Sequence, residues 1–177
     1  SRTVWTYLLL EKSEVKEVVQ NFYAYAERQF GKRIKKVQSD NGTEFVCLGS
    51  FFKSKGIIHQ TSCVGTPQQN GRVERKHRHL LNVARSLMFQ AKMPIKFWGE
   101  AVLTAAHVIN LTPTRILKGK CPHEVLFGST PSYSKLRVFG SLCFAHKQLR
   151  DKNKFVPRSR KCVFCRISFR EKGLEVI

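Results

Sequence analysis

The chain has 177 residues with 42% hydrophobic content, which is enough for one packed core and predicts a single main domain. Lysine and arginine number 32 against 12 aspartates and glutamates, so the formal net charge is +20. Such a charge predicts a polyanionic partner, with nucleic acid as the first choice. A membrane is disfavoured, because no apolar run approaches the roughly 20 residues of a spanning helix and no secretory signal or lipid anchor is visible.

Cysteine usage points to the environment of the protein. Six cysteines are spread through a chain of ordinary core-forming composition, unlike a disulfide-stapled secreted module, so we expect a reducing, intracellular setting. Cys162 and Cys165 have CxxC spacing, yet zinc needs four ligands and the only other nearby candidate is His146. A zinc site is therefore disfavoured.

The first third of the chain predicts alternating strands and helices. An apolar run, TVWTYLLL, follows Ser1 almost at once, so we expect the chain to begin inside a domain, with Thr3–Leu10 as a buried strand. An amphipathic helix over 14–30 follows and is stopped by Gly31. A second, short strand then ends in a cluster of turn formers that includes Asp40.

The middle of the chain predicts mainly helices. A short helix over 45–55 and a short strand over 57–60 precede a loop rich in Gly and Pro. A long helix follows and ends at Pro94; its apolar side runs through Val73, His77, Leu80, Ala84, Leu87 and Ala91. We expect His77 to pack on this side rather than to act as a base. A third helix is predicted over 97–111.

The end of the chain changes in character. A strand pair, or one extended strand bent at Gly140, is predicted first, and a markedly basic stretch follows it. We therefore divide the chain into a core over 1–130 and a basic C-terminal extension over 131–177.

Two carboxylates stand out by position. Asp40 lies at the end of a predicted strand, and Glu74 lies 34 positions later near the start of the long helix. Two such groups could converge on one point and offer the oxygen ligands that Mg²⁺ prefers. From spacing alone, the ordinary alternative is stronger: Asp40 as a turn former and Glu74 as a favourable partner of the helix dipole.

The surrounding sequence favours the metal site. The segments SDNGTEF at 39–45, GIIHQTSC at 56–63 and TPQQNGRVERKHR at 66–78 closely resemble copia-type retrotransposon integrases. The resemblance continues through KFWGEA at 96–101, NLTPT at 110–114 and RVFGSLCFAH at 137–146. It covers nearly the whole chain, although CRI at 165–167 departs from the pattern that family members tend to show there.

The resemblance implies an RNase H-like α/β fold, a mixed sheet flanked by helices, in which Asp, Asp and Glu hold two Mg²⁺ or Mn²⁺ ions for DNA strand transfer. Asp40 matches the second Asp and Glu74 the Glu. The first Asp of the family lies ahead of a Ser-Arg pair that matches Ser1 and Arg2, and no Asp occurs between Ser1 and Gln38. We therefore expect a first strand that is missing or incomplete and a chain that is inactive by itself.

A basic cluster beside Glu74 is the expected DNA contact. Its residues are Arg72, Arg75, Lys76 and Arg78, and the preceding Gln68, Gln69 and Asn70 could also touch DNA. The ordinary alternative is a solvated charged helix face. The resemblance further implies retroelement ends and target DNA as partners and a nuclear location, and it leaves homo-oligomerisation open.

Two alternatives to an integrase core fragment remain open at this stage. One is a catalytically inactive, basic nucleic-acid-binding remnant of such an element. The other is a transposon remnant that does not fold.

Overall fold

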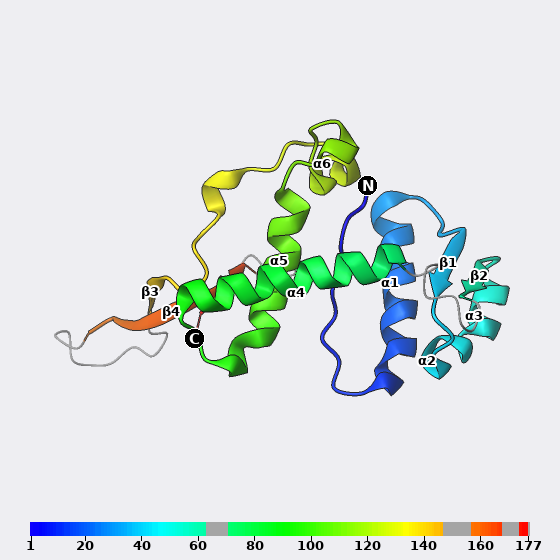
Figure 1. Ribbon diagram of the computed structural model, residues 1–177, viewed down its shortest axis with the longest axis horizontal. Helices are drawn as coiled ribbons and strands as arrows, with labels where there is room; N and C mark the ends of the chain where they lie inside the picture. The colour runs from blue at the N-terminus through cyan, green and yellow to red at the C-terminus, as the bar shows by residue number, and fades with distance from the viewer. Residues whose placement is uncertain (63–70, 147–156, 168–173, 177) are drawn as a thin grey trace. The chain divides into compact units, whose positions relative to one another are not determined.

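The computed structural model of the chain describes residues 1–62, 71–146, 157–167 and 174–176. Its contacts divide the chain into two compact units, Tyr7–His77 and Ser1–Thr6 with Arg78–Ile177. Helices alternate with short strands, in both parallel and antiparallel pairs, which confirms the expected α/β class (Figure 1). The expected division between residues 130 and 131, which rests on a change in composition, remains a prediction.

The unit Tyr7–His77 follows the predicted order of helix and strand closely. Its elements are η1 (Lys12–Glu14), α1 (Val15–Phe30), β1 (Lys36–Ser39), α2 (Thr43–Val46), α3 (Gly49–Ser54), β2 (Ile58–Thr61) and the first turns of α4 (Gly71–Ala91). The predicted first helix is confirmed as α1. It ends at Gly31, which adopts the left-handed φ of 57° and donates its backbone N–H to the carbonyl of Glu27 at 3.0 Å.

A parallel strand pair organises this unit. β1 pairs with β2 so that Lys36 lies opposite Ile58 and Ser39 lies opposite Thr61. Parallel neighbours require a crossover between them, and the segment that contains α2 and α3 makes it. The single helix expected over 45–55 is instead two short helices, which are separated by Cys47 and Leu48.

The crossover is held by a small apolar core. Leu48 and Phe52 are almost completely buried, and they pack with Ile57 and with Tyr23 of α1. The ring of Tyr23 meets that of Phe51 edge to face, with centroids 5.7 Å apart. This core fixes the crossover, and therefore the end of β1, against α1.

The second unit is built around α5. Its elements are the remainder of α4, η3 (Ile95–Phe97), α5 (Trp98–Leu111), η4 (Arg115–Leu117), α6 (Pro122–Phe127), η5 (Tyr133–Lys135), β3 (Leu142–His146), β4 (Ser159–Ile167) and β5 (Leu174–Val176). Ala101 and Ala105 of α5 are fully buried, and such small side chains let neighbouring backbones come close. Leu80 of α4 and Cys165 of β4 belong to the same cluster.

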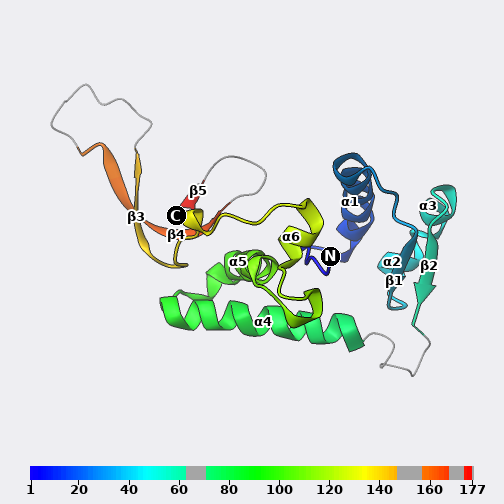
Figure 2. The same cartoon turned by 90° about the horizontal axis from the view of Figure 1, so that it is seen from above.

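The basic C-terminal part of the chain contains an antiparallel sheet with the strand order β3-β4-β5. Figure 2 shows β3 alongside β4. β4 is attached to α5 through the hydroxyl of Thr104, which donates to the backbone carbonyl of Cys165 at 2.9 Å. None of the helices in the described part of the chain is long and apolar enough to cross a membrane.

The prediction of a buried strand over Thr3–Leu10 is wrong. The segment is not assigned to a strand, and the side chains of Tyr7, Leu8 and Leu10 are exposed, the last to 97%. Val4 is instead held by the side-chain amide of Asn110, which accepts its N–H and donates to its carbonyl, both at 2.8 Å. Apolar composition favours a strand only if a neighbouring strand can complete the ladder, and no strand of the described residues pairs with this segment.

The exposed apolar segment predicts self-association of the isolated chain. We expect an apparent mass that rises with concentration in size-exclusion chromatography with light scattering, and a lower mass for the double variant Leu8→Lys/Leu10→Lys. Both side chains are exposed, so the substitutions leave the fold intact. The matched control, Val46→Lys/Ile116→Lys, adds the same charge at exposed positions elsewhere. A stable monomer for the unmodified chain contradicts the prediction.

We predict that protonation of His107 lowers the stability of the fold in mild acid. Burial, and secondarily the charge of His123, lower the pKa of His107 below the ordinary value of 6.5. The unfolded chain thus binds this proton more readily, so the free energy of unfolding falls as the pH drops below about 6.5. We expect His107→Gln to flatten this dependence in urea titrations between pH 7 and 5, whereas His79→Gln, at an exposed position, retains it. An unchanged slope in His107→Gln refutes this cause.

Candidate metal and nucleic-acid site

The carboxyl end of β1 is fixed by a buried hydroxyl. Ser39, only 9% exposed, donates its hydroxyl hydrogen to the backbone carbonyl of Asp40 at 2.8 Å. The same oxygen lies 2.8 Å from Nε2 of His59 on β2. Since the Ser39 hydrogen is used for the carbonyl, the consistent arrangement has the His59 N–H donating to Ser39. One side chain thus ties the peptide of Asp40 to the neighbouring strand.

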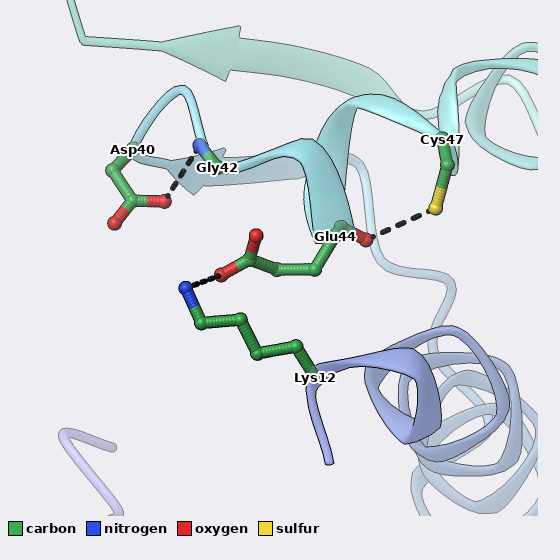
Figure 3. Close-up of polar contacts among 5 residues, drawn as sticks. All are labelled: Lys12, Asp40, Gly42, Glu44 and Cys47. Carbon is green, nitrogen blue, oxygen red and sulfur yellow. Dashed lines mark hydrogen bonds and ion pairs between the residues drawn. The ribbon is translucent and has the colours of Figure 1, made fainter.

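Asp40 follows directly, and its side chain is exposed. Oδ1 accepts the backbone N–H of Gly42 at 3.2 Å, so Asp40 does form the turn that its composition predicts (Figure 3). Across the strand pair, Nδ2 of Asn41 donates to the carbonyl of Ser62 at 2.8 Å. A carboxylate has about four lone-pair positions, so this turn contact leaves Asp40 able to bind another group.

A second acidic residue lies on the same segment. Glu44, in the first turn of α2, forms an ion pair with Lys12, whose Nζ lies 3.7 Å from Oε1 (Figure 3). The Glu44 carboxylate also lies over Gly42, where an added Cβ would stand only 2.7 Å from its atoms. A larger residue at position 42 would therefore require the flexible Glu44 side chain to shift. The backbone carbonyl of Glu44 accepts the thiol of Cys47 at 3.2 Å.

Glu74 lies in the first turn of α4 with its side chain exposed. Glu74 therefore lies at the start of a helix, as predicted, where its negative charge interacts favourably with the helix dipole. The joint assignment of Asp40 and Glu74 to one metal site remains a prediction from the resemblance. Within the described residues, no group of three or more His, Cys, Asp or Glu side chains could hold a metal ion.

The basic cluster is on the first two turns of α4. Arg72, Arg75 and Arg78 are exposed, and Lys76 is partly buried. The three polar residues expected to assist them, Gln68, Gln69 and Asn70, lie outside the described residues.

The prediction that His77 packs on the apolar side of this helix is wrong, because its side chain is exposed, as is that of Val73. The buried residues of α4 are Leu80 and Ala84. An apolar side of a helix is buried only over the turns that meet a core, and in α4 these begin after the basic cluster.

Reasoning from sequence missed Ser39, His59 and Glu44 as parts of this site. Ser39 and His59 are 20 positions apart, and only the parallel register of β1 and β2 brings them together. Glu44 is contained in the SDNGTEF segment, and its closeness to Asp40 in the sequence was the one feature that could have indicated its place in this site.

Comparison with a solved structure defines the class of this fold. The chain matches the crystal structure of the catalytic core domain of BIV integrase with a TM-score of 0.51 and 23% sequence identity, over 71% of this chain and 78% of that one. The expected fold class, the RNase H-like fold of an integrase catalytic core, is thereby confirmed. No family model matches the chain.

Sequence relatives define the lineage. The chain is 42% identical over 164 residues to a retrovirus-related Pol polyprotein from transposon RE1 of Arabidopsis thaliana. It is 40% identical over 166 residues to the Pol polyprotein from transposon TNT 1-94 of Nicotiana tabacum, and 38% identical to that from transposon RE2 of Arabidopsis thaliana. Each match covers 93% of this chain but only 11 or 12% of the relative. The chain is homologous to these retrovirus-related Pol polyproteins and corresponds to about a tenth of their length.

We predict that the hydrogen bonds of the Ser39 hydroxyl stabilise the segment that carries Asp40. Ser39→Ala removes both hydrogen bonds of the hydroxyl, the one to the Asp40 carbonyl and the one from His59, so we expect a loss of roughly 1–3 kcal/mol in the free energy of unfolding. Urea denaturation followed by circular dichroism measures it. Ser54→Ala, which removes an exposed hydroxyl bonded to the carbonyl of Phe51, is expected to change stability by less than about 0.5 kcal/mol. Equal effects of the two variants contradict the assigned role of Ser39.

Proposed function

We propose that this segment acts within an integrase catalytic core that joins the DNA ends of a retroelement to target DNA. The observation that carries the proposal is the match to copia-type Pol polyproteins over 93% of the chain, together with the integrase-core fold. Retroelement ends and target DNA are the proposed partners, and the nucleus is the proposed location. Homo-oligomerisation is compatible with the proposal.

Asp40 and Glu74 are the proposed ligands of Mg²⁺ or Mn²⁺. Both offer exposed carboxylate oxygens, the donor type that these hard cations take, and Asp40 has one described hydrogen bond to its Oδ1. When bound, the metal ions offset phosphate charge and activate the attacking hydroxyl. The chain itself positions the ligands: the Ser39–His59 contact fixes the strand end at Asp40, and helix α4 carries Glu74.

The third carboxylate is proposed to come from polypeptide outside these 177 residues. No aspartate occurs between Ser1 and Gln38, and the curated relatives are far longer than this chain. Two carboxylates alone are expected to hold a divalent ion weakly.

The exposed arginines of α4 are proposed to bind the DNA phosphates next to Glu74. Arg72, Arg75 and Arg78 project from the turns that begin the helix, and Lys76 lies between them. Positive side chains at this position neutralise phosphate charge and orient the backbone of the DNA without reading its sequence. Gln68, Gln69 and Asn70 are proposed to add polar contacts.

Strand transfer on a labelled DNA duplex with Mg²⁺ or Mn²⁺ tests the catalytic assignment. We expect this chain to be inactive and a form extended upstream by its Asp-bearing segment to be active. In the extended form, Asp40→Asn and Glu74→Gln are expected to abolish product formation, because each removes a ligand charge. Glu17→Gln, at an exposed position on α1, is the matched control and is expected to retain activity. Activity that survives Glu74→Gln overturns the site assignment.

The salt dependence of DNA affinity tests the basic cluster. Replacing Arg72, Arg75 and Arg78 by Gln is expected to make the slope of log K against log salt shallower by up to about 3, since each phosphate contact contributes roughly 0.9. The matched control replaces Lys16, Arg28 and Lys32, exposed residues in and just after α1, by Gln and removes the same charge. Equal changes in both triple variants identify diffuse attraction rather than a site on α4.

The second candidate function is a basic nucleic-acid-binding remnant without catalysis. The observation that favours it is the net charge of +20, which suits a polyanionic partner without requiring catalysis. The same experiments separate the candidates. If neither the chain nor its extended form transfers strands, yet both bind DNA with a steep salt dependence, the binding function is the correct one.

A further inference from the structure

Two cysteines lie directly opposite one another in the antiparallel pair of β3 and β4. The register places Cys143 against Cys162, flanked by the pairs of Leu142 with Val163 and of Phe144 with Lys161. The thiol of Cys143 reaches toward β4 and lies 3.4 Å from the backbone carbonyl of Cys162. The spacing of the sequence had instead drawn attention to Cys162 and Cys165.

Directly paired residues of an antiparallel ladder project from the same face of the sheet, with Cα atoms about 4.5–5.5 Å apart. Disulfides form between residues whose Cα atoms are about 4.4–6.8 Å apart, so the backbone separation is suitable. The Cβ atoms of such pairs are about 4.5–5.5 Å apart, and a disulfide needs about 3.5–4.5 Å. A small approach of the two strands is therefore enough to close the bond.

The surroundings of the three thiols favour the cross-strand pair over the CxxC pair. Cys165 is fully buried in the cluster around α5. The thiols of Cys162 and Cys165 each lie 3.6 Å from a backbone carbonyl of their own strand, those of Arg160 and Val163. Cys162 is buried but does not belong to that cluster, and Cys143 is partly exposed. A small oxidant can thus reach Cys143 from solvent. Cys162 lies directly opposite Cys143 on β4 and is therefore the thiol placed to react with it next.

We propose that Cys143 and Cys162 form a reversible dithiol–disulfide site whose oxidant is a low-molecular-weight disulfide such as oxidised glutathione. The Cys143 thiol first loses its proton to solvent. Its thiolate attacks one sulfur of glutathione disulfide, that S–S bond breaks, and one glutathione thiolate leaves and takes up a proton. The Cys162 thiolate then attacks the Cys143 sulfur of the mixed disulfide and releases the second glutathione. Two protein thiols are oxidised and one glutathione disulfide is reduced to two thiols.

The first step is expected to be slow at neutral pH. Burial, and secondarily the neighbouring Cys162, raise the pKa of Cys143, so a small fraction is thiolate near pH 7. Raising the pH increases that fraction, and the rate of oxidation is expected to rise with it. Once formed, the bond ties β3 to β4, and β4 carries Phe164 and Cys165 into buried positions. The oxidised hairpin is therefore expected to open less readily.

The test is to incubate the reduced, folded chain with oxidised glutathione, block remaining thiols with N-ethylmaleimide, and map the digested peptides by mass spectrometry. We expect a linked peptide pair containing Cys143 and Cys162, lighter by two hydrogen atoms than the reduced pair and released by dithiothreitol. Cys47→Ser, at an exposed position outside the sheet, is the matched control and keeps the link. Cys162→Ser is expected to stop at a glutathione adduct on Cys143.

Cys143→Ala, at the partly exposed member of the pair, is the second variant and abolishes the link even if Cys162→Ser fails to fold. Circular dichroism confirms that each sample is folded, and the same reaction in urea shows which links arise without the native register. The proposal is overturned if the folded chain forms no link, if it links Cys162 to Cys165, or if either cysteine of the pair joins a different cysteine. None of these outcomes depends on DNA binding or strand transfer, so this site stands or fails separately from the proposed function.

Discussion

The parallel pairing of β1 with β2 is the constraint on which the candidate site depends. Parallel strands cannot be joined by a tight turn, so the chain must cross over through α2 and α3, and the core of Leu48, Phe52 and Tyr23 holds that crossover. The same register brings His59 to Ser39, and Ser39 holds the peptide of Asp40. The carboxylate is thus placed by strand pairing and not by the turn alone.

The turn after β1 satisfies two demands at once. Asp40 stabilises the loop by accepting the N–H of Gly42, and it still presents carboxylate oxygens to solvent. The Glu44 carboxylate lies over Gly42, and Lys12 forms an ion pair with that carboxylate.

The second unit shows how small residues determine packing. Ala101 and Ala105 let α5 approach its neighbours closely, and the strand β4 is attached to it through Thr104 and the buried Cys165. From its composition, the region after residue 147 was predicted only to be markedly basic. Arg160 and Lys161, near the start of β4, are exposed, whereas Cys162, Phe164 and Cys165 further along the strand are buried. A basic segment and a packed strand are compatible here because the charged residues and the buried residues occupy different parts of the strand.

The sequence by itself determined α1, the long helix α4 and α5, because their apolar residues recur at a spacing that any helix obeys regardless of its neighbours. It also determined the class of the fold through motifs spread over nearly the whole chain, and it placed Asp40 at a strand end and Glu74 at a helix start. Only the tertiary structure decided that Thr3–Leu10 is exposed rather than a buried strand, that His77 is exposed, and that Ser39 meets His59 and Cys143 meets Cys162. The physical reason is the same in each case. Burial and strand pairing depend on partners distant in the chain, and the local composition does not determine which partner is present.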